Sequence, residues 1–215
     1  MTRIKVCGIT TERDALEAVY LGADALGFVF DPGSPRFISP RTAAEISRRL
    51  PPFVARIGVF VDQDPQVIVE TVDIARLTGA QLNGAEPPEV CRRLPVSWYK
   101  AFRVHRGFRV EQLARFECNT FLIEAREEGM HGADHEERAG WNLARAGGRY
   151  GRVILSGGLD PTNVEEAVRH VRPYAVEAVE GTEFEPGVKD IEKLERFVAA
   201  VRKADADLAG EGTAP

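Results

Sequence analysis

The feature that most constrains the fold is a regular alternation of short apolar runs with helix-sized segments along the 215 residues. The strand-like runs cover residues 3–7, 23–30, 54–61, 78–82, 98–104, 120–125, 152–156 and 174–179. Helical patterns are expected at 11–21, 40–50, from 64 onward, 87–94, 110–116, 161–171 and 190–204. Strands that are separated by crossover segments pair in parallel, so the pattern predicts an α/β fold with a parallel sheet.

The number of units and the chain length favour a single (β/α)8 TIM barrel over residues 1–204, followed by a frayed C-terminal tail at 205–215. An open doubly wound sheet is the alternative. It is disfavoured because no GxGxxG fingerprint follows the first strand. The polar, glycine-containing segment 126–140 breaks the alternation, and we expect a long loop there over the catalytic face.

Composition limits the partners that such a chain can have. The net charge is −5 and the arginines are scattered, which gives no reason to expect nucleic acid. The apolar runs are far shorter than the roughly 20 residues that cross a bilayer. Cys7, Cys91 and Cys118 are odd in number, and neither they nor the four histidines have metal-type spacing. We therefore expect no disulfide framework and no metal.

The same features predict where the protein acts and with what. A chain that enters a strand directly, without a charged and then apolar leader, and that carries unpaired thiols is expected in the cytoplasm. The expected partner is a small-molecule substrate, with neither nucleic acid nor a membrane involved. The quaternary state is expected to be a monomer or a homodimer.

Candidate functional residues follow the strands, because active sites of such barrels lie at the carboxyl ends of the strands. Cys7 and Glu124 end the first and sixth strands, where a thiol and a carboxyl group can face each other across one ligand. One such group can accept a carbon-bound proton while the other donates to a leaving oxygen. A buried structural thiol and a structural ion pair are the alternatives for these two residues.

Other strand ends suggest binding roles. Arg36 sits in a rigid Pro-Gly-Ser-Pro turn and can hold a carboxylate in a bidentate manner. Gly157 and Gly158 precede a helix and expose backbone N–H groups, which suits a phosphate. Asn83 follows the fourth strand, and Glu177 and Gly181 belong to the eighth strand and its loop; we assign these three residues to substrate binding as well.

Ordered matches along nearly the whole chain strengthen this interpretation. They are KVCGIT (5–10), GADALGFVF (22–30), SPRFISP (34–40), GVFV (58–61), QLNG (81–84), SGGL (156–159), RPY (172–174) and PGVKD (186–190). With these segments the chain resembles phosphoribosylanthranilate isomerase, a (β/α)8 enzyme of tryptophan biosynthesis. The resemblance implies an Amadori rearrangement without metal or cofactor, with Cys7 as the general base, the strand-six carboxylate as the general acid and Arg36 holding the anthranilate carboxylate.

The chain departs from the family pattern at several functional positions, which include Asn83 in place of a histidine and Glu177 in place of an aspartate. Glu124 stands where the family has aspartate, and Glu180 follows the eighth strand in place of a serine. A carboxylate 4 Å from a phosphate would repel it by about 4 kcal/mol per pair of unit charges at an effective dielectric of 20. Two alternatives to the isomerase follow. One is a diverged paralogue with a different, non-phosphorylated substrate, and the other is a non-catalytic binding barrel.

Overall fold

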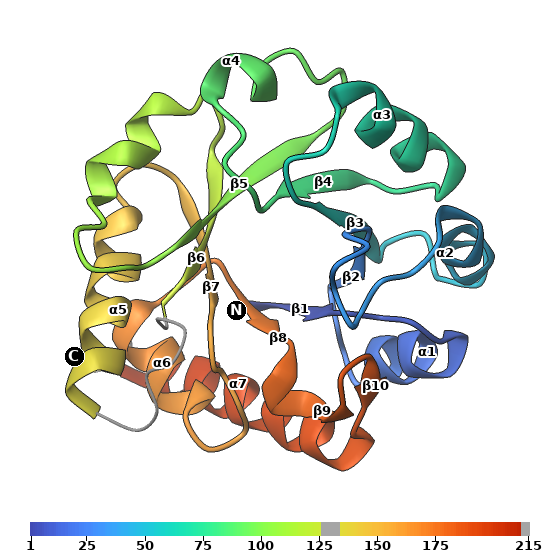
Figure 1. Cartoon of the computed structure of the whole chain (residues 1–215). Helices are drawn as coiled ribbons and strands as arrows, with labels where there is room; N and C mark the ends of the chain where they lie inside the picture. Colours follow the sequence, from blue (N-terminus) through green and yellow to red (C-terminus); the bar gives the residue numbers. More distant parts are fainter. Residues whose placement is uncertain (126–133, 212–215) are drawn as a thin grey trace.

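The structure is a computed structural model that describes residues 1–125 and 134–211. Eight parallel strands close into a barrel in chain order, with β8 pairing back to β1 (Figure 1). They are β1 (Arg3–Cys7), β2 (Ala25–Val29), β3 (Ala55–Phe60), β4 (Gly79–Leu82), β5 (Trp98–Arg103), β6 (Thr120–Glu124), β7 (Arg152–Ser156) and β8 (Ala175–Ala178). The predicted (β/α)8 barrel is therefore confirmed, and the open sheet is excluded.

Helices surround this barrel (Figure 1). They are α1 (Glu12–Tyr20), α2 (Pro40–Ser47), α3 (Pro65–Ile74), α4 (Pro88–Cys91), α5 (Asp134–Gly147), α6 (Val164–Val171) and α7 (Ile191–Glu211). A 3-10 helix, η1 (Val110–Arg115), takes the helical place between β5 and β6. The helix starts follow local chemistry: Thr11 accepts a hydrogen bond from the Asp14 amide, and Ser39 caps α2 immediately before Pro40.

Two expectations about the chain differ from the structure. Residues 134–140 are the first two turns of α5, whereas the sequence pattern predicted a loop through 140. The pattern was misleading because residues 134–140 include no large apolar residue; the first one in this helix is Trp141, which is buried. Residues 126–133 of the expected loop lie outside the described residues.

The C-terminal helix is also longer than expected. Helix α7 continues through Glu211, so residues 205–211 are helical and not frayed. Asp205 accepts hydrogen bonds from the amide and hydroxyl of Thr2 at 2.9 and 2.7 Å, and the Arg202 Nη1 donates to the Thr2 carbonyl at 2.6 Å. These contacts hold the end of the helical ring against the start of β1.

The barrel interior is layered. Successive strand residues point alternately inward and outward. The outward residues pack against the helices in the main core, which includes Ile4, Leu26 and Phe60. Inside the barrel, an apolar cluster of Tyr99, Ala101, Leu122, Ile154 and Ala175 forms a separate layer. A second interior cluster contains Cys7, Val29 and Val59 at the carboxyl ends of their strands.

Beyond β8, the chain adds elements that the regular alternation does not contain. A short 3-10 helix, η2 (Glu180–Thr182), leads into an antiparallel hairpin of β9 (Glu183–Glu185) and β10 (Val188–Lys189). Gly187 turns the hairpin with a φ of 84°, a conformation that favours glycine. The hairpin lies next to α1 and the start of α7 (Figure 1).

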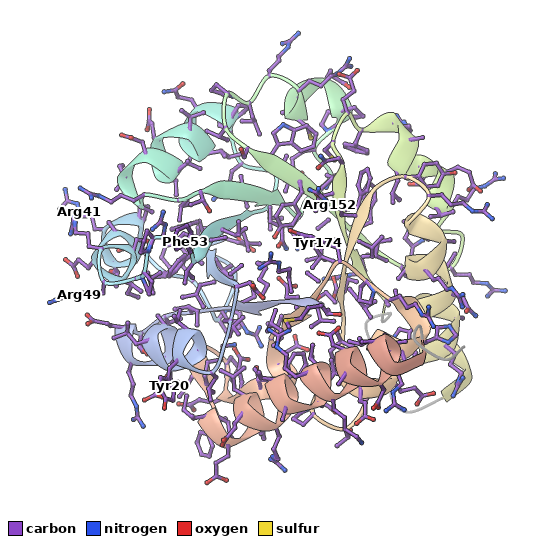
Figure 2. All side chains as sticks on the ribbon, turned by 180° about the vertical axis from the view of Figure 1, so that it is seen from behind. Tyr20, Arg41, Arg49, Phe53, Arg152 and Tyr174 are labelled. Atoms are coloured by element: carbon purple, nitrogen blue, oxygen red, sulfur yellow. The ribbon has the colours of Figure 1, made fainter. Side chains whose placement is uncertain are left out.

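The amino ends of the strands carry exposed aromatic side chains. Tyr20, Phe53 and Tyr174 precede β2, β3 and β8 and are exposed, with Phe53 98% accessible (Figure 2). The Arg152 guanidinium lies over the Tyr174 ring at 5.3 Å from its centroid. Within the described residues, no helix is long and apolar enough to cross a membrane.

Candidate active site

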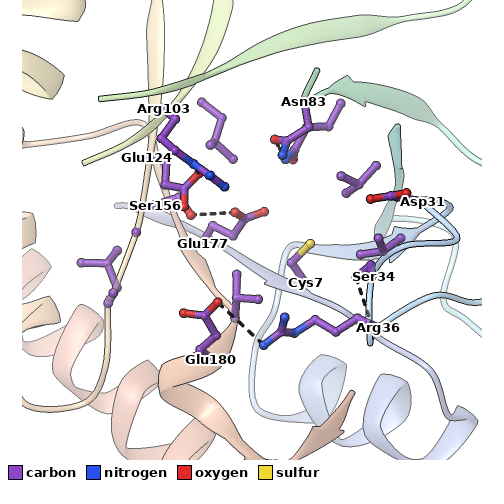
Figure 3. Close-up of a pocket in the computed structure, with 18 of the residues that line it drawn as sticks. Cys7, Asp31, Ser34, Arg36, Asn83, Arg103, Glu124, Ser156, Glu177 and Glu180 are labelled. Atoms are coloured by element: carbon purple, nitrogen blue, oxygen red, sulfur yellow. Dashed lines mark hydrogen bonds and ion pairs between the residues drawn. The ribbon is translucent and has the colours of Figure 1, made fainter. Parts of the chain in front are cut away.

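One pocket lies at the carboxyl ends of the strands and has a volume of about 230 Å³. It brings together all the residues to which the sequence analysis assigned a catalytic or substrate-binding role. These are Cys7, Arg36, Asn83, Glu124, Gly157, Gly158, Glu177 and Gly181. Figure 3 shows Cys7, Arg36, Asn83, Glu124 and Glu177 around this pocket. Residues from β1, β4, β6, β7 and β8 thus converge on one cavity, as expected where strands of one barrel end together.

The Cys7 side chain lies at the end of β1, next to a glycine on β2. Its register partner is Gly27, and a Cβ at that position would lie only 2.4 Å from the Cys7 Sγ. Glycine at position 27 therefore gives the thiol its space. Burial raises the pKa of the Cys7 thiol to about 11, although the adjacent Lys5 ammonium opposes this shift. The unliganded site thus holds a protonated thiol with a cation beside it.

That cation is the centre of a buried polar network below the pocket. The Lys5 Nζ lies 3.4 Å from the Cys7 Sγ, donates to the Gln81 Oε1 at 2.7 Å and forms an ion pair with Glu177. The Ser156 hydroxyl donates to the other Glu177 oxygen at 2.7 Å. The Gln81 amide donates to the Asn83 Oδ1 at 3.0 Å, which connects the network to the pocket wall.

The network fixes the charges of its members. Burial alone would raise the pKa of Glu177, but the Lys5 ammonium and the hydrogen bonds outweigh it and hold this pKa below its ordinary value. Burial opposes charge on Lys5, yet Cys7 and Glu177 raise its pKa well above the ordinary value. Glu177 is therefore an ionised partner of Lys5 at the bottom of the pocket, with both side chains almost fully buried.

Glu124 ends β6 at another side of the pocket (Figure 3). Burial raises the pKa of its carboxyl group, and the Arg103 guanidinium, which donates to the Glu124 Oε2 at 3.1 Å, partly opposes that shift. Arg103 is the register partner of Glu124 on β5. A carboxyl group that holds its proton to a higher pH than usual is better suited to donate a proton than an ordinary surface glutamate.

Arg36 reaches the pocket from the turn after β2. Its Nε lies 3.0 Å from the Glu183 Oε1 and its Nη2 lies 2.6 Å from the Glu183 Oε2. Gly8, with a φ of 77°, permits this path, because a Cβ there would lie 2.7 Å from the Arg36 Cδ. The exposed Glu180 also reaches toward Arg36, with 3.8 Å between its Oε1 and the Nη2 (Figure 3).

The glycines after β7 and β8 form the remaining wall. Gly157 and Gly158 have φ values of 95° and 66°, which side chains rarely adopt. A Cβ on Gly181 would lie 2.2 Å from the Leu159 carbonyl oxygen, so the loops after β7 and β8 meet at backbone distance. Such closely packed loops, with no side chains on their glycines, can present N–H groups to an anion.

The sequence analysis missed several residues of this site. It assigned no role to Lys5, Gln81 or Glu183. A signal was available for the first two, because a charged or amide side chain inside a buried strand needs a buried partner. Glu183 had no such signal, because it lies in the short hairpin that the strand–helix alternation does not predict.

No group of side chains in the described part of the chain has the composition and convergence of a metal site. The pocket contains a thiol and a carboxyl group that can exchange protons, an arginine and a wall of glycine-rich loops. Such a set is suited to moving protons on a small anionic substrate.

Comparison with known proteins shows the family to which this chain belongs. The family described as N-(5'phosphoribosyl)anthranilate (PRA) isomerase matches residues 4–200. The N-(5'-phosphoribosyl)anthranilate isomerase of Geobacter sp. (strain M21) is 46% identical over 203 residues, which cover 94% of this chain and 99% of the relative.

Solved structures agree with the sequence match. The phosphoribosyl anthranilate isomerase of Thermotoga maritima has a TM-score of 0.86 and 38% identity, covering 94% of this chain and 100% of its own. A phosphoribosyl anthranilate isomerase in complex with reduced 1-(O-carboxyphenylamino)-1-deoxyribulose 5-phosphate has a TM-score of 0.80 and 38% identity, with the same coverage. The chain therefore belongs to the N-(5'-phosphoribosyl)anthranilate isomerase family.

Proposed function

We propose that this protein isomerises N-(5'-phosphoribosyl)anthranilate to 1-(o-carboxyphenylamino)-1-deoxyribulose 5-phosphate in tryptophan biosynthesis. The observation that carries the proposal is the shared pocket of Cys7 and Glu124, a thiol and a carboxyl group at the ends of two strands. The relatives that match the whole chain bear the name of this activity, and one of them was solved with the reduced product.

The proposed reaction is an Amadori rearrangement by general acid–base catalysis. Glu124 protonates the ribose ring oxygen, which opens the ring and leaves a protonated imine. Cys7, as the thiolate, then removes the proton from C2′ and produces an enolamine, which tautomerises to the ketose. The protonated imine is itself the electron sink, so the reaction requires neither a metal nor an organic cofactor. Lys5 supports this role because its ammonium favours the thiolate.

The ends of the substrate are both anionic, and the pocket has a feature for each. Arg36 binds the anthranilate carboxylate, and the amides of Gly157, Gly158 and Gly181 bind the phosphate. Asn83 and Glu177 lie between these ends and contact the ribose hydroxyls. Glu180 extends toward Arg36, with which it forms an ion pair at 3.8 Å (Figure 3). This geometry supports a phosphorylated substrate despite the extra carboxylate.

A complementation experiment tests the activity. The chain is expressed in a tryptophan auxotroph that lacks the isomerase, and growth without tryptophan is scored. Wild-type protein and Cys118→Ala should restore growth, because Cys118 lies outside the pocket, whereas Cys7→Ala and Glu124→Gln should not. Purified wild-type protein should also remove the fluorescence of freshly made phosphoribosylanthranilate. Absence of growth and turnover for soluble wild-type protein would contradict the proposal and favour a diverged or non-catalytic barrel.

The cellular setting is part of the proposal. All three cysteines lie in the described part of the chain and are free thiols, which supports a reducing compartment and hence the cytoplasm. The protein is a monomer or a homodimer, and light scattering of the purified chain distinguishes the two. Fractionation of cells that express the chain with an exposed tag tests the location.

A further inference from the structure

A buried ion cluster lies behind the arginine of the pocket. Glu183, on β9, contacts both the Nε and the Nη2 of Arg36, at 3.0–3.1 and 2.6 Å. The Lys189 Nζ, on β10, donates to the Glu183 Oε1 at 2.9 Å. The side chains of Lys189 and Glu183 are 0% and 4% exposed, so the cluster is closed on the side away from the pocket.

The carboxylate of Glu183 has a fixed position. The Gly187 amide donates to its Oε1 at 3.2 Å, and the Lys193 Nζ donates to its main-chain carbonyl at 2.9 Å. The hairpin is in turn tied to the start of the barrel, because the Lys189 amide donates to the Asp14 Oδ2 at 3.1 Å. Burial would raise the pKa of Glu183, but Arg36 and Lys189 hold it below the ordinary value, so the carboxylate stays ionised.

This geometry decides which part of the guanidinium can meet a ligand. A guanidinium has five N–H donors in one plane, and a two-point contact with a carboxylate fixes that plane. Among the described residues, Glu183 contacts the Nε and the Nη2, and Glu180 lies 3.8 Å from the Nη2. We therefore expect the Nη1 to be the donor that meets a carboxylate in the pocket. The orientation of Arg36 therefore does not have to be acquired when the ligand binds.

The charge of the cluster also has a consequence. A lone Arg36–Glu183 pair would be neutral and would attract a second carboxylate only weakly. Lys189 adds a positive charge, so Arg36, Glu183 and Lys189 together keep one unit of positive charge. They do so without placing a second cation in the pocket, because the Lys189 side chain is completely buried. The carboxylate of Glu180, 3.8 Å from the Arg36 Nη2, is 71% exposed, so solvent screens its opposing charge.

From these contacts we infer that Glu183 is a positioning residue that orients Arg36 for the planar carboxylate of the substrate, with Lys189 keeping the cluster cationic. The β9–β10 hairpin, an addition to the eight repeated units, is then a specificity element. The inference deepens the proposed function, on which it rests for the identity of the carboxylate ligand. What it adds is that the preference of the pocket for a carboxylate ligand depends on Glu183.

The first test uses two ligands that differ only in the group that would bind Arg36, which is a carboxylate in one and a neutral amide in the other. Calorimetry measures the binding of anthranilate and of 2-aminobenzamide to the wild-type protein, to Glu183→Gln and to Glu185→Gln. Glu185 lies in the same hairpin but is exposed, so its variant is a matched control. The wild type and the control should prefer anthranilate, and Glu183→Gln should lose most of this preference. An unchanged preference in Glu183→Gln, or none in the wild type, would overturn the inference.

The second test separates orientation from simple charge balance. Removal of the Glu183 carboxylate leaves the buried Lys189 ammonium without its ion-pair partner. Glu183→Gln is therefore compared with Glu183→Gln/Lys189→Met, in which this unpaired charge is also removed. If orientation matters, both variants should show a roughly 100-fold lower kcat/KM, mainly through KM, which is the scale expected for about 1 Å of misplacement. Recovery of wild-type KM in the double variant would instead assign Glu183 a purely structural role.

A third measurement needs no variant. In the wild type, the Nε–H of Arg36 should exchange slowly with solvent in NMR spectra, because it donates to a buried carboxylate. A rapidly exchanging Nε–H would refute the fixed orientation. The tests also separate the two proposals: a Glu183-dependent carboxylate preference without turnover of phosphoribosylanthranilate would reject the proposed function and keep the positioning role.

Discussion

Two buried lysine–glutamate pairs, Lys5–Glu177 and Lys100–Glu86, have nearly the same exposure and very different surroundings. Lys5 points into the barrel, where its partners besides Glu177 are the side chains of Gln81 and Cys7. Lys100 points outward, and besides Glu86 it donates to the main-chain carbonyls of Leu82 and Gly84 at 3.0 and 2.7 Å.

The difference shows how one kind of interaction serves two purposes. Glu86 also accepts hydrogen bonds from the Asp62 and Gly84 amides at 2.9 and 3.2 Å, so the outer pair fastens the loops after β3 and β4. The Lys5 ammonium of the inner pair contacts the Cys7 thiol, and Glu177 lines the pocket itself. The outer pair thus connects two loops, whereas the inner pair sets the electrostatic surroundings of Cys7.

The largest expected effect is common to both pairs and concerns stability. Lys100→Met and Lys5→Met each leave a buried glutamate without its cation, which should lower the free energy of unfolding by about 3–5 kcal/mol. Urea titration of each variant and of the exposed-site control Lys203→Met measures the loss. A loss below about 1 kcal/mol for either buried pair would show that water reaches the stranded carboxylate.

The second prediction separates the pairs by removing both charges at once. Lys5→Met/Glu177→Gln should fold but lose roughly 100-fold in kcat/KM, because general-base catalysis contributes about that much or more and the thiolate loses its cation. Lys100→Met/Glu86→Gln should keep kcat/KM within a few-fold. Steady-state assays of the two double variants provide the comparison, which fails if the outer variant is the more impaired in catalysis.

The third prediction concerns pH. In the proposed mechanism the productive state contains a Cys7 thiolate and a protonated Glu124, whereas the pKa of Cys7 is about 11 and that of Glu124 is raised above the ordinary glutamate value. Between these two pKa values the productive fraction is a constant minority, so kcat/KM should be flat. It should fall below the pKa of Glu124, because the thiolate fraction still decreases with falling pH while the protonated fraction of Glu124 no longer rises to offset it. It should also fall above about pH 11, because the thiolate is then fully formed while the protonated fraction of Glu124 still decreases.

Glu124→Gln should change the shape of this profile as well as its height. Without the acid, only the thiolate fraction varies, so kcat/KM should rise tenfold per pH unit up to the pKa of Cys7. Lys5→Met/Glu177→Gln should remain flat but at a lower level, with its basic limb moved to higher pH, because the Lys5 ammonium lowers the pKa of Cys7 more than the Glu177 carboxylate raises it. Unchanged profiles in both variants would mean that other groups carry the protons.

The smallest effect is expected at an exposed carboxylate. The side chain of Glu180 is 71% exposed, and its contact with Arg36 is long at 3.8 Å, so solvent screens its charge far more than in the buried pairs. Glu180→Ser should therefore bind inorganic phosphate only about fivefold more tightly than the wild type. Calorimetry in low salt measures this change, with Glu185→Ser as the control. A hundredfold gain would place Glu180 directly against the bound anion.

The sequence predicted the eight strands closely, because each is an apolar run of suitable length between helical patterns. The eight residues that it named as site candidates all line one pocket, since strand ends of a parallel barrel share one face. The sequence could not predict the Lys5–Glu177 and Arg36–Glu183 contacts, which join residues far apart in the chain and depend on register. The first turns of α5 were missed because segment 134–140 has polar residues and no apolar stripe.

The hydrogen bonds between Thr2 and Asp205 have a consequence for folding during translation. The two residues are 203 positions apart, so β1 cannot acquire its final neighbours until the last helix has left the ribosome. Cys7 lies on that strand. In the folded chain Cys7 is 5% exposed and burial raises the pKa of its thiol, so it should react more slowly than a thiol in an unfolded chain. A short pulse of a bulky thiol reagent should therefore label Cys7 more extensively early in refolding than after the two ends have met.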